Sequence, residues 1–173
     1  KAKIYNQLDV DNKELFIKGW KDLDEQATYN KESIQQLFYY YMFYLRALEK
    51  DIKTTTPGIR KYYANEKFKR LFEVDLMDNL CIILNLWKVI DGEAWSKNNK
   101  IKQSLDTLSS YPNEFWKYPV VIYYICHRNK EDFEVKFTAF LNKLLLELFT
   151  KYLISPTVNA VKTDILKLNA EIV

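Results

Sequence analysis

The chain has 173 residues, of which 48% are hydrophobic and 16% aromatic, with 13 Tyr, 10 Phe and 4 Trp. This length fits one domain with a substantial core, and 3 Gly and 4 Pro are too few for the tight turns that an all-β domain needs. A formal charge of +3 permits nucleic-acid binding without requiring it. We therefore expect one all-α domain over residues 1–173, an irregular bundle of roughly seven to nine helices around a central aromatic-rich helix.

The periodicity of the apolar residues, and the breaks between the periodic segments, predict where the helices lie. In chain order they span residues 11–27, 31–50, 59–63, 66–72, 75–90, 101–108, 132–153 and 158–173. Asp11 is the expected N-cap of the first helix, because Glu14 follows it at the spacing of a capping box. The second helix is the expected centre of the fold, since residues 37–45 are apolar or aromatic on every side.

Two stretches also have the composition of strands. Residues 37–45 are rich in Tyr and Phe, which favour sheets, but they show no polar alternation, so a helix is preferred. Residues 120–126 are β-branched and aromatic and are the most strand-like part of the chain, yet no second strand stands beside them. Pro119 precedes them and is expected either to begin a helix or to kink one.

Nothing in the sequence resembles a signal peptide or a membrane span. The longest uncharged stretch, residues 33–45, is too short and too rich in Tyr and Gln to cross a bilayer. Cys81 and Cys126 lie far apart in apolar runs, which is typical of buried reduced thiols. We expect a cytoplasmic protein with no membrane partner. The chain begins at Lys1, inside an uncapped helical pattern, and this predicts that it is part of a longer protein.

The candidate catalytic residues are few. His127 is the only histidine and has too few cysteines for a zinc site; we expect it at a helix end, where a cation is favoured. Cys126 beside it would point in another direction on a helix, so the two form no dyad. The acidic residues in 22–25 and 131–134 could offer oxygens to a metal, but solvated faces and acidic first turns are the preferred interpretation. Without any phosphate loop, dinucleotide fingerprint or nucleophile elbow, we expect no catalytic, cofactor-binding or metal-binding residue in this chain.

The segment from Lys50 to Arg70 is the best candidate for a contact surface. Its cations are Lys50, Lys53, Arg60, Lys61, Lys67, Lys69 and Arg70. Cations on a flexible break followed by short helices suit phosphate contacts, and the interleaved Tyr62, Tyr63 and Phe68 could stack on exposed bases. The alternative is an ordinary solvated basic face whose aromatic residues point into the core. Residues 97–102 form a second, weaker basic candidate.

Several stretches together resemble one protein family. They are KAKIYN at 1–6, FIKGW at 16–20, LFYYYM at 37–42 with LRA at 45–47, FWKYP at 115–119 and PTVNA at 156–160. These are similar to the mostly helical region that follows the N-terminal nuclease-like domain in the GmrSD type of modification-dependent restriction proteins. The resemblance covers most of the chain.

The resemblance implies a multidomain bacterial defence protein. The family carries a ParB-like nucleotide-hydrolysing domain upstream and often an HNH-type nuclease domain downstream, so the parent would be a nucleotide-dependent restriction endonuclease. Neither motif occurs in this chain, and no catalytic residue can be carried over. The chain would be a non-catalytic scaffold between nuclease-type domains. Its expected partners are DNA, the neighbouring domains of the parent chain and a second copy of itself.

Two other functions stay open at this point. The first is a stand-alone α-helical protein–protein interaction module that uses exposed aromatic residues as anchors. The second is a small helical enzyme in which carboxylates hold a metal.

Overall fold

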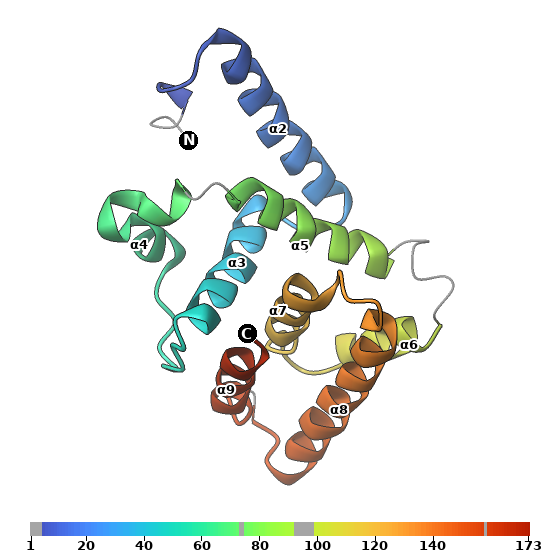
Figure 1. The fold of residues 1–173 in the computed structure, drawn as a ribbon. Helices are drawn as coiled ribbons and strands as arrows, with labels where there is room; N and C mark the ends of the chain where they lie inside the picture. The colour runs from blue at the N-terminus through green and yellow to red at the C-terminus, as the bar shows by residue number, and fades with distance from the viewer. Residues whose placement is uncertain (1–4, 73–74, 92–98, 158) are drawn as a thin grey trace.

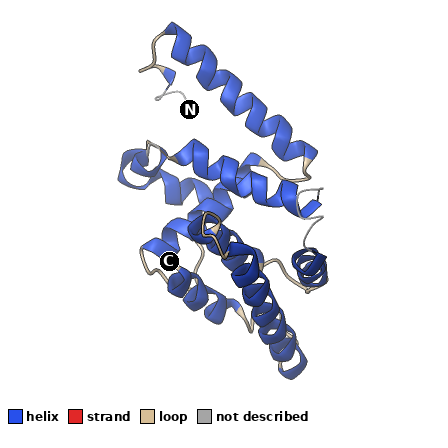
Figure 2. Cartoon of the chain, turned by 45° about the vertical axis from the view of Figure 1, so that its right-hand side comes forward, coloured by secondary structure: helices blue, strands red, loops and turns tan. Residues whose placement is uncertain are grey.

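The computed structural model describes residues 5–72, 75–91, 99–157 and 159–173 (Figure 1). The elements are α2 (Val10–Tyr29), α3 (Ile34–Leu48), α4 (Ile59–Ala64), the 3-10 helix η1 (Asn65–Leu71), α5 (Leu76–Asp91), α6 (Asn99–Ser109), α7 (Lys117–His127), α8 (Phe133–Ile154) and α9 (Lys162–Ile172). These described ranges contain no strand (Figure 2). The predicted all-α class is therefore confirmed.

The centre of the fold is α3, as its composition predicts. It contacts α2, α4, α5, α7 and α9 (Figure 1). The helix begins at the N-cap Ser33, whose hydroxyl accepts the Gln36 N–H at 3.1 Å. Because α3 is apolar all round, it is stable only when other helices enclose it. Its buried residues are Leu37, Tyr40, Tyr41, Met42, Phe43, Leu45, Arg46 and Ala47.

Aromatic rings join α3 to its neighbours. Phe43 of α3 stacks on Tyr118 of α7, with ring centroids 3.8 Å apart. Tyr40 lies near Trp87 of α5 at 5.3 Å and near Tyr118 at 6.2 Å. Its hydroxyl donates to the Glu32 carboxylate at 3.3 Å. Burial raises the pKa of Tyr40 and of Tyr118 far above the usual value, so both rings remain neutral parts of the core.

The start of α2 differs from the prediction. The N-cap is Asp9 rather than Asp11, and the expected capping box with Glu14 is wrong. Asp9 has extended backbone angles, and its carboxylate accepts the Asn12 N–H at 2.9 Å and the Asn12 side-chain amide at 2.8 Å. These hydrogen bonds lower the pKa of Asp9. Asp9 can therefore satisfy an N–H of the first turn, and Asp11 becomes part of that turn.

The strand-like residues 120–126 form most of α7, which packs against α3, α5, α8 and α9. Pro119 lies in the first turn of α7, where its missing N–H removes no helical hydrogen bond. The β-branched residues are buried by neighbouring helices, and this packing outweighs their preference for strands.

The predicted helix over 66–72 is also different, since the segment is the 3-10 helix η1. Lys67 and Phe68 have φ values of 57° and 69°, in the left-handed region that bulky residues rarely adopt. Two such residues in succession cannot continue an α-helix.

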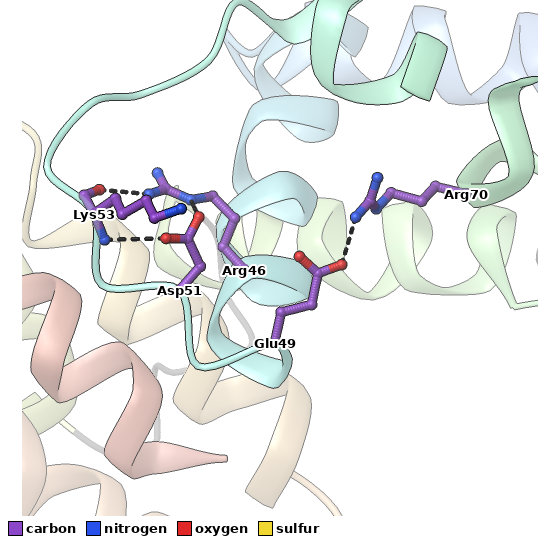
Figure 3. Close-up of polar contacts among 5 residues, drawn as sticks. All are labelled: Arg46, Glu49, Asp51, Lys53 and Arg70. Atoms are coloured by element: carbon purple, nitrogen blue, oxygen red, sulfur yellow. Dashed lines mark hydrogen bonds and ion pairs between the residues drawn. The ribbon is translucent and has the colours of Figure 1, made fainter. Parts of the chain in front are cut away.

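Arg46 is the charged residue of the core, with a relative exposure of 1%. Its Nε donates to an Asp51 carboxylate oxygen at 2.8 Å, and its Nη2 donates to the Lys53 carbonyl at 2.5 Å (Figure 3). The second Asp51 oxygen accepts the Lys53 N–H at 3.0 Å. Burial raises the pKa of Asp51, but these hydrogen bonds outweigh burial and hold the pKa below its usual value. The pair closes the turn in which the chain leaves α3, where Lys50 has a φ of 53°.

Asp51→Asn keeps the size of the side chain but leaves the buried Arg46 guanidinium without its counter-charge. We expect the free energy of unfolding at pH 7 to fall by about 3 kcal/mol, the lower end of the range for breaking a buried pair, because Asp51 is only partly buried. Urea unfolding followed by circular dichroism measures this. The matched variant Asp164→Asn removes the exposed partner of Lys151 and should cost less than about 1 kcal/mol.

The difference in the free energy of unfolding between Asp51→Asn and the unchanged protein should become smaller at low pH. The pKa of Asp51 in the folded state lies below the ordinary value of 3.8. The ion pair therefore stabilises the fold fully above that value, and its contribution is lost as the pH falls through the lowered pKa. Below the lowered pKa the two proteins should approach equal stability. A difference in stability that stays the same as the pH falls from 7 through that pKa would contradict the assignment.

Candidate nucleic-acid interface

The predicted basic segment forms the loop after α3, the helix α4 and the 3-10 helix η1, on one side of the molecule (Figure 1). Six of its seven cations are exposed, whereas Arg70 is half-buried. The structure divides these residues into those that hold the segment in place and those that point to solvent.

Lys50 and Lys53 hold the loop. The Lys50 ammonium donates to the Ala170 carbonyl at 2.5 Å, in the last turn of α9, where a cation is favoured. Lys53 bonds to Arg46 and Asp51 through its backbone, and its ammonium helps to lower the pKa of Asp51 (Figure 3). Both cations are thus used within the fold.

Arg70 joins η1 to the end of α3. Its guanidinium donates to the Glu49 carboxylate at 2.5 Å (Figure 3). The same guanidinium lies over the Tyr62 ring, 4.4 Å from its centroid. Burial raises the pKa of Tyr62 to about 12, against the opposing effect of Arg70. Tyr62 is a core residue. Arg70 therefore anchors the segment, and of the three interleaved aromatic residues Tyr62 and Tyr63 are buried whereas Phe68 is exposed.

The remaining cations are Arg60, Lys61, Lys67 and Lys69, all exposed. Among the described residues, the side chains of Arg60, Lys61 and Lys67 make no hydrogen bond or ion pair. They lie on short elements whose ends are fixed by Arg70 and by the turn around Arg46. This arrangement offers positive charges on an ordered backbone.

A hollow of about 560 Å³ opens between the N-terminal half of α3, α4 and η1. It is lined by Gln35, Phe38, Ile59, Arg60, Tyr63, Ala64, Phe68 and Leu71. Tyr63 and Phe38 form one wall, with perpendicular rings 5.3 Å apart, and the Tyr63 hydroxyl donates to the Phe38 carbonyl at 2.8 Å. Phe68 stays 39% exposed. The hollow is thus largely apolar, with the cation of Arg60 in its lining.

Sequence reasoning identified Tyr63, Phe68 and Arg60 as parts of this site but missed Gln35, Phe38, Ile59 and Leu71. Phe38 lies 25 residues before Tyr63. Its place in an all-apolar helix carried no signal that one edge of that helix borders a hollow.

The other candidate chemistries find little support in the geometry. Within the described ranges, no three His, Cys, Asp or Glu side chains gather as metal ligands. The acidic groups lie beside lysines: Lys21 pairs with Glu25 at 3.7 Å, and Lys136 with Asp132 at 2.6 Å. These contacts are typical of solvated helix faces.

His127 ends α7, as expected, and its ring meets Tyr123 edge-on at 4.5 Å. Burial, then Lys130 and Lys136, lower the pKa of His127, so the ring is largely neutral at pH 7. Cys81 and Cys126 are free thiols, half-buried rather than fully buried, and burial raises the pKa of each. A thiol with a raised pKa is a poor nucleophile.

Comparison of the chain with protein-family models, with curated proteins and with solved structures gives no match. In the part of the chain that the structure describes, no helix has both the length and the hydrophobicity of a membrane span. A proposal about function therefore depends on the residues of the chain itself. The predicted basic candidate at 97–102 lies partly outside the described residues, and Lys100 and Lys102 are exposed on α6.

The variant Arg70→Gln tests whether Arg70 stabilises the fold and whether Lys61 and the other exposed cations contact DNA. We expect it to lower the free energy of unfolding by about 1 kcal/mol, since it removes both the Glu49 contact and the cation–π contact. Its affinity for DNA at low salt should stay comparable to that of the unchanged protein. Lys61→Gln, the control, should weaken DNA binding and leave unfolding unchanged. Urea unfolding and fluorescence anisotropy measure the two effects, and the reverse pattern would contradict the anchoring role of Arg70.

Proposed function

We propose that this chain is a non-catalytic helical domain of a GmrSD-like restriction protein, which acts as a scaffold between nuclease-type domains and contacts DNA through α4 and η1. The exposure of Arg60, Lys61 and Lys67, with no partner among the described residues, is the observation that carries the DNA contact. The family and the scaffold role are supported by the resemblance of the sequence.

The physical case for DNA is electrostatic. Each lysine or arginine that neutralises a phosphate releases condensed counterions, so a few well-placed cations are enough for measurable binding at low salt. The short elements α4 and η1 are anchored through Arg70 and Glu49, which limits the ordering that binding must still impose. These contacts would position the domain on the DNA backbone without reading its sequence.

The proposed scaffold role would use a different surface, on α8. Val135, Leu146 and Leu153 of α8 are exposed, on the face opposite the buried residues Phe137 and Leu144. An exposed apolar stripe on a helix is typical of a contact surface. A neighbouring domain of the parent chain would cover it in the cytoplasm.

The stand-alone protein-interaction module is less well supported. Its expected anchors are exposed Trp and Tyr side chains. Trp20, Trp87 and Trp116 are buried, and Tyr29, with 88% exposure, stands at the end of α2. The large aromatic side chains that the structure describes therefore serve mainly the core.

The triple variant Arg60→Glu, Lys61→Glu, Lys67→Glu tests DNA binding. With about three phosphate contacts, the affinity of the unchanged protein should fall about 40-fold between 50 and 200 mM salt. The triple variant should lose most of the binding at low salt and most of this salt dependence. Fluorescence anisotropy with a labelled duplex measures both.

The matched control is Lys18→Glu, Lys143→Glu, Lys167→Glu, which makes the same charge change at exposed sites on α2, α8 and α9. It should bind nearly as well as the unchanged protein. Equal losses in the two triple variants would show that only net charge matters and would overturn the proposed surface.

A further inference from the structure

The hollow beside α4 is lined mainly by apolar side chains, which the phosphate backbone of a DNA duplex would not contact. Phosphates need cations, and the exposed faces of α4 and η1 supply those without any concavity. The hollow adds about 560 Å³ of space lined mainly by apolar and aromatic side chains. A ligand that fills it must carry a flat or bulky apolar group next to a negative charge.

Three side chains decide what kind of group fits. Phe68 has a relative exposure of 39%, so part of its side chain is accessible to a ligand in the hollow. Arg60 adds a cation to the lining. Gln35, exposed on the first turn of α3, offers an amide that can both donate and accept a hydrogen bond.

The backbone of η1 supports a binding role for Phe68. Lys67 and Phe68 both have positive φ values, an uncommon conformation for a lysine and a phenylalanine. Such conformations persist only where the surrounding structure imposes them, and they cluster at binding sites. Here they hold an aromatic ring at the lining of the hollow with a lysine directly before it.

We propose that the hollow binds one unpaired base of single-stranded DNA, which stacks on Phe68, while Arg60 and Lys67 contact the adjoining phosphates. This inference rests on the proposed DNA-binding function and names the form of DNA that the surface prefers. An aromatic platform beside cations is the usual basis of single-strand binding. An acidic peptide with an apolar side chain would also satisfy the charge. We assign the hollow to a base because the flat face of a base can stack on Phe68 while its edge hydrogen-bonds to the Gln35 amide.

The test compares three labelled probes by fluorescence anisotropy at low salt: a 12-nucleotide oligothymidine, an abasic strand of the same length and a duplex of the same length. The full chain should bind oligothymidine about fivefold more tightly than the abasic strand, the lower end of the range for stacking one base. Phe68→Ala should reduce this ratio to about one, while the weak binding that depends on phosphate contacts remains. Circular dichroism checks that the variant is folded.

Two further variants serve as controls for Phe68→Ala. Phe68→Tyr retains a ring and should keep the preference for oligothymidine over the abasic strand. Tyr29→Ala removes a ring that is 88% exposed at the end of α2, and it should change nothing. If Phe68→Ala keeps the preference, or if Tyr29→Ala loses it equally, the assignment of the hollow is overturned.

The outcomes separate this inference from the proposed function. Equal binding of oligothymidine and the abasic strand, abolished by the triple glutamate variant, would keep the phosphate-contact surface and overturn the base site. No binding to any of the three probes would overturn both. Displacement of oligothymidine by an acidic peptide with an apolar side chain more readily than by excess abasic strand would assign the hollow to a protein segment and overturn the base site.

Discussion

The packing of other helices around α3 is the constraint on which the rest of this structure depends. A helix that is apolar around its whole circumference cannot lie at a surface, so α2, α4, α5, α7 and α9 all contact it. The same packing buries Arg46, a charge that is tolerated only because Asp51 and the Lys53 carbonyl meet it within hydrogen-bonding distance. The centre of the core thereby dictates the path of the chain as it leaves α3.

The position of the candidate interface follows from that path. The turn around Arg46 directs the loop away from α3, and Arg70 then brings η1 back to Glu49 at the same end of α3. Between these two attachments lies α4, with Arg60 in the lining of the hollow. The surface that we assign to DNA is therefore a consequence of two arginines that are themselves occupied inside the fold.

The helices were largely predictable because apolar periodicity and the scarcity of Gly and Pro act locally. Residues 120–126 show the limit: their strand-like composition is local, whereas the helices that bury them are distant in sequence. The basic segment was also recognisable from the sequence. Which of its cations hold the fold together and which remain exposed for contacts in solvent was not. Lys50 contacts Ala170 across 120 residues and Arg70 contacts Glu49 across 21, and no local pattern shows that folding brings these groups together. The hollow was not predictable for the same reason, since Phe38 lines it from α3, 25 residues before Tyr63.

The most direct measurement is a nuclear magnetic resonance titration of the ¹⁵N-labelled chain with oligothymidine, which maps binding residue by residue. The central claim is that DNA contacts α4, η1 and the first half of α3. It predicts shifts of the amide signals of Gln35, Arg60, Lys67 and Phe68, and unchanged signals along α6 and α8. Shifts concentrated on α8, or spread evenly over the exposed lysines of the whole chain, would contradict it.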